Sequence, residues 1–146
     1  MNINEDDIDS ADLLYVHPTF AAQNNSKTVR AGDILTVRTG HPGISAVVPT
    51  ELDRCQTFTQ LITTVTRDNC SRFVCLALNS GQARSYFDAV SWGSAQKNIS
   101  VPLLAGAPVP FLPLAQQRVI VDSVDSHQQQ WSRTQAALTK QLHLLI

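Results

Sequence analysis

The C-terminal stretch from Leu114 to Ile146 limits how this chain can fold more than any other feature of the sequence. Before it, apolar residues lie in short runs, whereas from Leu114 onward they take helical spacing. One face repeats in alternating steps of four and three residues, which is typical of a coiled-coil seam. Its members are Ile120, Val124, His127, Trp131, Thr134, Leu138, Gln141 and Leu145.

This predicted helix needs a partner helix. It would extend about 50 Å at 1.5 Å per residue, which is too far to fold back onto a domain of this size. The polar seam positions His127 and Thr134 would lower stability but can fix register or partner choice. We therefore expect residues 113–146 to be a coiled-coil helix that pairs with a second copy of the chain or with another protein.

Size and composition indicate one domain before the helix. With 146 residues and 43% hydrophobic residues, the chain can bury a core of its own. No apolar run approaches the roughly 18 residues that a membrane span needs, and the N-terminus is no secretory signal, so we expect a cytoplasmic protein without membrane contact. The three cysteines, Cys55, Cys70 and Cys75, form no C-x-x-C pattern and favour reduced thiols over disulfides or a metal site.

The local patterns predict an α+β fold over residues 1–112. Residues 1–11 read as a flexible acidic arm, and the apolar run Leu13–Val16 could form a short strand. Glycines and a proline at residues 39–43 predict the tip of a β-hairpin. The expected elements are strands at 34–38, 44–48 and 58–65, a loop at 21–27, and helices at 71–78, with Asn69 as its N-cap, and 82–90. The fold class is thus a twisted mixed sheet with short helices, followed by one long C-terminal coiled-coil helix.

No catalytic constellation is present in the sequence. A nucleophile elbow, a phosphate-binding glycine loop, a zinc-binding H-E-x-x-H and a dinucleotide fingerprint are all missing. We expect a chain that is no enzyme itself and carries no cofactor. Net charge is −1, but most of the acidic surplus lies at the N-terminus, so the remainder is mildly basic and compatible with a nucleic-acid surface.

Side chains that can contact duplex DNA lie mostly in the predicted loops. Arginine can bond guanine in a bidentate manner, glutamine and asparagine can do so with adenine, and lysine holds phosphates. A hairpin tip also presents its side chains far from the core. The candidates are Arg38, His41, Arg30, Arg54, Gln96, Lys97 and Asn98, with Arg72 and Arg84 as further cations. The alternative for residues 96–98 is that the loop only shapes the entry to the helix.

Two segments carry a resemblance to a known family. The first combines Gly93, Gln96, Asn98 and Ile99 with a proline-flanked apolar segment, taken as a strand, and a helix start at Pro113-Leu114. The second runs from Gly32-Asp33 through Arg38-Thr39-Gly40 to Pro49. Together they resemble a target recognition domain of the specificity subunit of type I restriction–modification enzymes. Leu112 stands where the family often has a proline, and Gln116 where it often has an acidic residue before the matching glutamine, which is Gln117 here.

This resemblance implies a non-catalytic module that recognises one half of a split double-stranded DNA target. Specificity subunits usually have two recognition domains separated by an antiparallel coiled coil, which docks the methyltransferase subunits. Partner subunits bind S-adenosylmethionine and ATP. This chain holds one recognition domain, and compared with the family pattern we expect that domain to lack its first strands. Three interpretations fit: a half-subunit that pairs with itself, a fragment of a longer subunit, and a degenerate reading frame. The alternative functions are a protein-interaction remnant without DNA binding and a small enzyme of unrecognised type.

Overall fold

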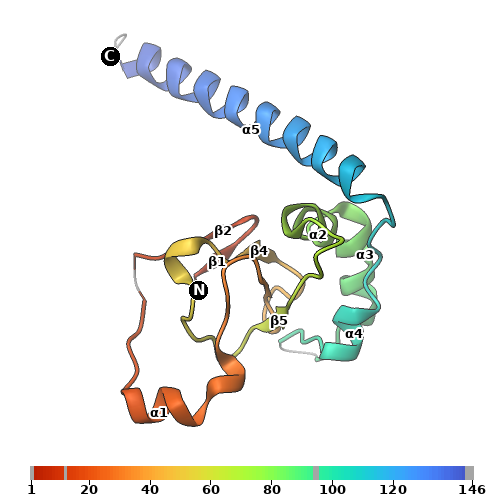
Figure 1. Cartoon of the computed structure of the whole chain (residues 1–146). Helices are drawn as coiled ribbons and strands as arrows, with labels where there is room; N and C mark the ends of the chain where they lie inside the picture. Colours follow the sequence, from red (N-terminus) through yellow and green to blue (C-terminus); the bar gives the residue numbers. More distant parts are fainter. Residues whose placement is uncertain (1, 12, 94–95, 144–146) are drawn as a thin grey trace.

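A three-stranded antiparallel sheet lies at the centre of the domain (Figure 1). The computed structural model describes residues 2–11, 13–93 and 96–143. Strand β3 (Ile34–Thr36) lies between β4 (Ser45–Val47) and β5 (Leu61–Thr63), so that Leu35 is opposite both Ala46 and Ile62. The predicted hairpin and the strand after it are confirmed, although β5 is shorter than expected because the chain bends at residues 58–60.

Both faces of this sheet are buried. Successive side chains of a strand point to opposite faces, and Ile34 and Leu35 accordingly belong to different clusters. Leu35 packs with Val37, Val48, Ile3 and others on one face. Ile34 packs on the other with Cys75 and Phe87 from the helical part of the domain. The buried hydroxyls of Thr36 and Ser45, which are cross-strand partners, hydrogen bond to each other at 2.9 Å.

The prediction of a flexible arm at residues 1–11 is wrong for the part that folds into a hairpin. Strands β1 (Ile3–Asn4) and β2 (Asp7–Ile8) pair, and the Asp6 N–H donates to the Ser45 carbonyl at 3.1 Å. Ile3 is buried in the core. Acidic composition suggested a solvated segment, but Ile3 and Ile8 pack on the core, and the carboxylates of Glu5 and Asp6 have specific partners in the domain.

In the described part of the chain, five α-helices complete the domain and its extension. Helix α1 (Pro18–Gln23) and a 3-10 turn (Asn25–Lys27) replace the expected loop, whereas residues 13–16 form no strand. Helices α2 (Ser71–Leu78) and α3 (Gly81–Val90) confirm two predictions, although Cys70 rather than Asn69 is the N-cap of α2. The segment expected as a strand forms the short helix α4 (Val101–Ala105) and an irregular stretch before α5 (Leu114–His143).

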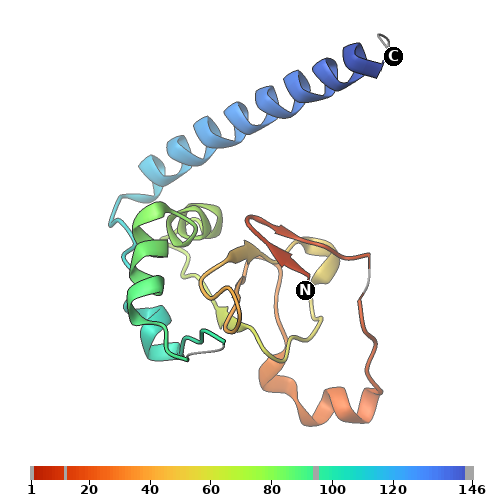
Figure 2. The ribbon, with the colours of Figure 1, turned by 180° about the vertical axis from the view of Figure 1, so that it is seen from behind.

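Helix α5 confirms the predicted long C-terminal helix. Its 30 residues correspond to about 45 Å. Figures 1 and 2 show that it starts beside α2 and runs away from the domain, with α1 at the opposite end of the molecule. Among the described residues, no helix is long and apolar enough to cross a membrane. The α+β fold class with a protruding helix is thus confirmed.

Candidate nucleic-acid interface

Two loops that are far apart in sequence lie side by side in the structure. The backbone N–H of Ile99 donates to the Arg38 carbonyl at 3.0 Å, and that of Gly40 donates to the Lys97 carbonyl at 2.9 Å. The Thr39 hydroxyl donates to Asn98 Oδ1 at 2.5 Å. We call the surface formed by residues 38–43, 92–93 and 96–99 the loop platform. It unites most of the predicted DNA contacts.

Trp92 closes the second loop of the platform. Its N–H donates to the Asn98 carbonyl at 3.1 Å, and the Asn98 N–H donates back at 2.8 Å. Gly93 adopts a φ of +110°, and a Cβ there would lie 2.2 Å from the Gln96 carbonyl oxygen, so this tight turn requires glycine. The Trp92 side chain remains 49% exposed. The sequence analysis missed it, although its place directly before Gly93 was the available signal.

The hairpin tip rests on helix α3. Gly43 has a φ of +100°, and a Cβ at this position would lie 2.3 Å from the Phe87 ring. Phe87 is almost completely buried. Direct packing of the backbone on an aromatic ring fixes the height of the tip above the core. The platform is therefore held from below as well as by its internal hydrogen bonds.

The platform presents several polar side chains to solvent. Arg38, His41 and Gln96 are exposed. Lys97 is exposed too, but its ammonium group pairs with Asp88 Oδ1 at 2.8 Å, and this hydrogen bond lowers the pKa of the Asp88 carboxyl. Asn98 is half-buried, and its amide is engaged with Thr39 and with the Gln96 carbonyl. Its present role is to hold the loop.

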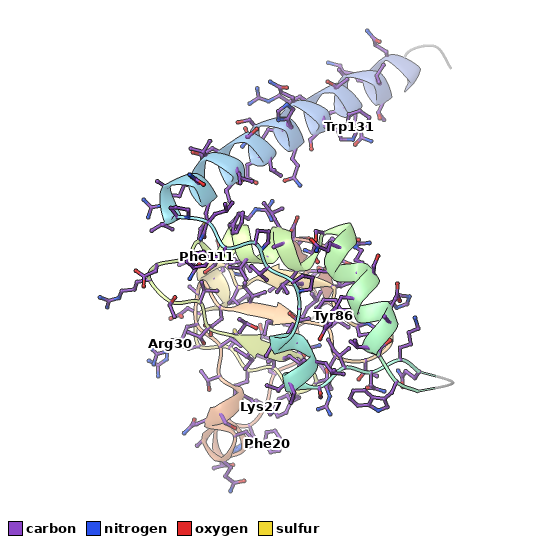
Figure 3. All side chains as sticks on the ribbon, turned by 90° about the vertical axis from the view of Figure 1, so that its right-hand side faces the viewer. Phe20, Lys27, Arg30, Tyr86, Phe111 and Trp131 are labelled. Carbon is purple, nitrogen blue, oxygen red and sulfur yellow. The ribbon has the colours of Figure 1, made fainter. Side chains whose placement is uncertain are left out.

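The remaining two candidates lie elsewhere. Arg30 and Arg54 are exposed near the end of the sheet where β3 begins, opposite the hairpin tip (Figure 3 labels Arg30). Their backbones are tied down there: the Arg30 N–H donates to Asp33 Oδ2 at 2.8 Å, and the Arg54 N–H donates to the Val29 carbonyl at 2.9 Å. The structure therefore divides the predicted set into a platform group and a distant pair.

Arg72 and Arg84 form ion pairs within the chain. Arg72 on α2 contacts Asp6 at 2.9 Å and Asp125 on α5 at 3.0 Å, and it also donates to Gln128 at 3.0 Å. Partial burial alone would lower the pKa of the Arg72 guanidinium, but the hydrogen bonds that it donates to Asp125 and the charge of Asp6 raise this pKa overall. Arg84 pairs with Glu5. Both arginines thus hold the N-terminal hairpin.

The cysteines offer no metal site within the described part of the chain, where no group of three or more potential ligands is found. Cys55 is exposed, whereas Cys75 is buried and contacts Asp6 Oδ1 at 3.4 Å. Burial, together with the nearby Asp6 charge, raises the pKa of the Cys75 thiol to about 12. At neutral pH this thiol is therefore protonated, which is unsuitable for a nucleophile or a metal ligand.

The sequence was compared with protein-family models and with curated proteins. No protein-family model matches the chain. Over 127 residues it is 31% identical to the specificity subunit of the type I restriction enzyme EcoEI from Escherichia coli, an alignment that covers 80% of this chain. The chain is homologous to type I specificity subunits. It spans 21% of the length of that relative.

The fold agrees with a solved specificity subunit. The crystal structure of the HsdS subunit from Thermoanaerobacter tengcongensis superposes with a TM-score of 0.62 at 20% sequence identity. The match covers 73% of this chain and 28% of that subunit. This match confirms the α+β fold, and together with the sequence match to the EcoEI subunit it confirms the resemblance to type I specificity subunits.

The predicted coiled-coil seam of α5 forms a stripe along the helix that is largely exposed. Trp131 and Leu138 are 65% and 55% exposed, and Ile120 is also exposed. Figure 3 shows Trp131 on the part of the helix beyond the domain. His127 and Thr134 bond back to their own helix backbone, while Val124 is half-buried near the domain. Leu145 lies outside the described residues.

An adjoining face of α5 anchors the start of the helix to the domain. Gln117 is only 1% exposed, and its Oε1 accepts the Cys70 N–H at 2.8 Å. Its Nε2 donates to Asn69 Oδ1 at 2.9 Å and to the Leu112 carbonyl at 2.8 Å. Val121 is buried one turn further along. The domain therefore holds the start of the helix, beside the first residues of the stripe, and leaves the stripe uncovered farther along at Trp131 and Leu138.

Proposed function

We propose that the chain is a DNA-recognition module whose loop platform recognises one half of a split duplex target. The observation that supports this most is the union of Arg38, His41, Gln96 and Lys97 on one surface built from two loops. Arginine and glutamine can bond base edges in the major groove, and lysine can hold phosphates. Exposed Trp92 adds an apolar group at the same surface.

In this proposal, α5 docks the partners. Its exposed stripe pairs with the same stripe of a second copy, or with a second specificity half. The paired helices then bind a methyltransferase subunit. A two-fold dimer would present two platforms to one duplex. Catalysis belongs to the partner subunits, which bring their own cofactors, and this chain contributes recognition. The proposed place of action is the cytoplasm.

A second candidate is a protein-interaction module that does not bind DNA. The net charge of −1 and the exposed apolar stripe of α5 favour it. Binding to duplex DNA separates the two functions, because phosphate contacts make such binding steeply dependent on salt.

We expect the purified chain to bind a fluorescent random-sequence duplex, with an affinity that falls as salt rises. Replacing Arg38 by alanine should weaken binding roughly three- to tenfold, since an exposed cation leaves the platform. Arg30→Ala is the matched control, because Arg30 is also exposed but lies at the other end of the sheet. Fluorescence anisotropy at two salt concentrations measures both effects.

Absence of duplex binding even at low salt would favour the interaction module. Equal losses from Arg38→Ala and Arg30→Ala would show that the chain binds DNA through its overall charge rather than through the platform.

A further inference from the structure

Asp88 and Lys97 form an ion pair at the edge of the platform. Asp88 lies in the last turn of α3, and its carboxylate accepts from Lys97 Nζ at 2.8 Å. Their side chains are 72% and 49% exposed, respectively. An ion pair this exposed is weak, because water solvates and screens both charges. A phosphate oxygen that approaches Lys97 could therefore replace the Asp88 carboxylate.

Helix stability gives no reason for an aspartate at this position. The C-terminal end of a helix carries a partial negative charge, which disfavours a carboxylate there. Apart from Lys97, no described side chain donates a hydrogen bond to the Asp88 carboxylate. The lowered pKa of Asp88 fits the same picture, since it reflects the favourable contact with Lys97.

We propose that Asp88 is a specificity-determining residue that restrains Lys97 from binding DNA phosphates indiscriminately. This inference rests on the proposed function of the platform. In the free protein, Asp88 occupies the ammonium group of Lys97, so a random duplex gains little from this cation. Where base contacts hold a matching duplex in place, a phosphate is kept close enough to displace Asp88. The ion pair thereby penalises wrong sequences more than the correct one.

The test measures binding of the full chain to a random-sequence duplex by anisotropy. We expect Asp88→Asn to bind about threefold more tightly at low salt, and to show a steeper salt dependence by about one phosphate contact. Glu51→Gln is the matched control for the loss of one negative charge. Glu51 is exposed in the 3-10 turn Thr50–Leu52, at the other end of the sheet, and its side chain has no hydrogen bond or ion pair among the described residues.

A double-substitution cycle tests whether Asp88 acts through Lys97. In the Lys97→Gln background, Asp88→Asn should change affinity no more than Glu51→Gln does. Wild-type binding together with equal effects of Asp88→Asn and Glu51→Gln would overturn the inference but leave the proposed function standing. If neither the wild type nor Asp88→Asn binds duplex at low salt, both are overturned.

Discussion

Gln117 shows how much one buried polar side chain can connect. Its amide satisfies the N–H of Cys70, Asn69 Oδ1 and the Leu112 carbonyl, and so joins α5 to the start of α2 and to the segment before α5. Replacing it by alanine removes all three hydrogen bonds at once, and two of them involve backbone groups of the half-buried residues Cys70 and Leu112. We expect Gln117→Ala to lower the free energy of unfolding by about 2–3 kcal/mol, measured by urea denaturation.

Gln116 is the matched control, because it is exposed and adjacent on the same helix. Gln116→Ala should change the free energy of unfolding by less than about 0.5 kcal/mol. Similar effects of the two substitutions would mean that the three hydrogen bonds of Gln117 add nothing to stability.

The sequence marked Gln117 only as part of a resemblance. Its role could not be predicted from local pattern, because its partner Cys70 lies 47 positions away. The expected N-cap Asn69 failed for the same reason: its side-chain oxygen is taken by Gln117. Lys97 was found as a DNA candidate, but its partner Asp88 and the aromatic neighbour Trp92 were not, since only the folded loop brings them together.

At the scale of elements, two arginines hold the same N-terminal hairpin with different degrees of burial. The Arg72 side chain is 23% exposed and bridges Asp6 of the hairpin to Asp125 of α5. The Arg84–Glu5 pair is about half exposed on both sides. We expect Arg72→Met to cost about 1.5–3 kcal/mol, because partly buried carboxylates lose their charged donor. Arg84→Met should cost less than about 0.5 kcal/mol.

Urea denaturation measures the loss in free energy of unfolding for both variants, and amide hydrogen exchange shows which elements are destabilised. Arg72→Met should speed exchange in β1, β2 and the first turns of α5, whereas Arg84→Met should leave α5 unchanged. Unaltered exchange in Arg72→Met would show that hairpin and helix are held independently of this arginine.

Elements with a strong local signal were predictable, and those that depend on distant contacts were not. The β3–β4 hairpin follows from a Gly-His-Pro-Gly tip between β-branched runs, and α2 from helical spacing. The N-terminal hairpin has only two residues per strand, and its docking depends on Ile3 and Asp6 contacting residues far along the chain. Likewise α4 begins at Val101-Pro102, where proline suits a first helical turn but apolar content suggested a strand.

At the scale of the whole molecule, the start of α5 packs against the domain, whereas the outer part of the helix is exposed to solvent. The helix contacts the domain near Gln117 and Val121, and beyond Gln128 its residues up to 141 are exposed. An isolated helix with Trp131 and Leu138 in water gains nothing from its apolar stripe, so burial against a second helix is favourable. The seam pattern in the sequence predicted this stripe, and the structure shows that the domain leaves it uncovered.

We expect the chain to self-associate through this stripe. Trp131→Gln should weaken association at least about tenfold, because a large apolar side chain leaves the seam. Gln129→Ala is the matched control: two positions away on a helix, it lies about 200° around the axis from Trp131. Light scattering over a concentration series measures the change in mass. Neither substitution should alter duplex binding per platform, because both lie far from residues 38–43. If Trp131→Gln and the wild type have the same mass at every concentration, the stripe serves a different chain, and a methyltransferase subunit becomes the next partner to test.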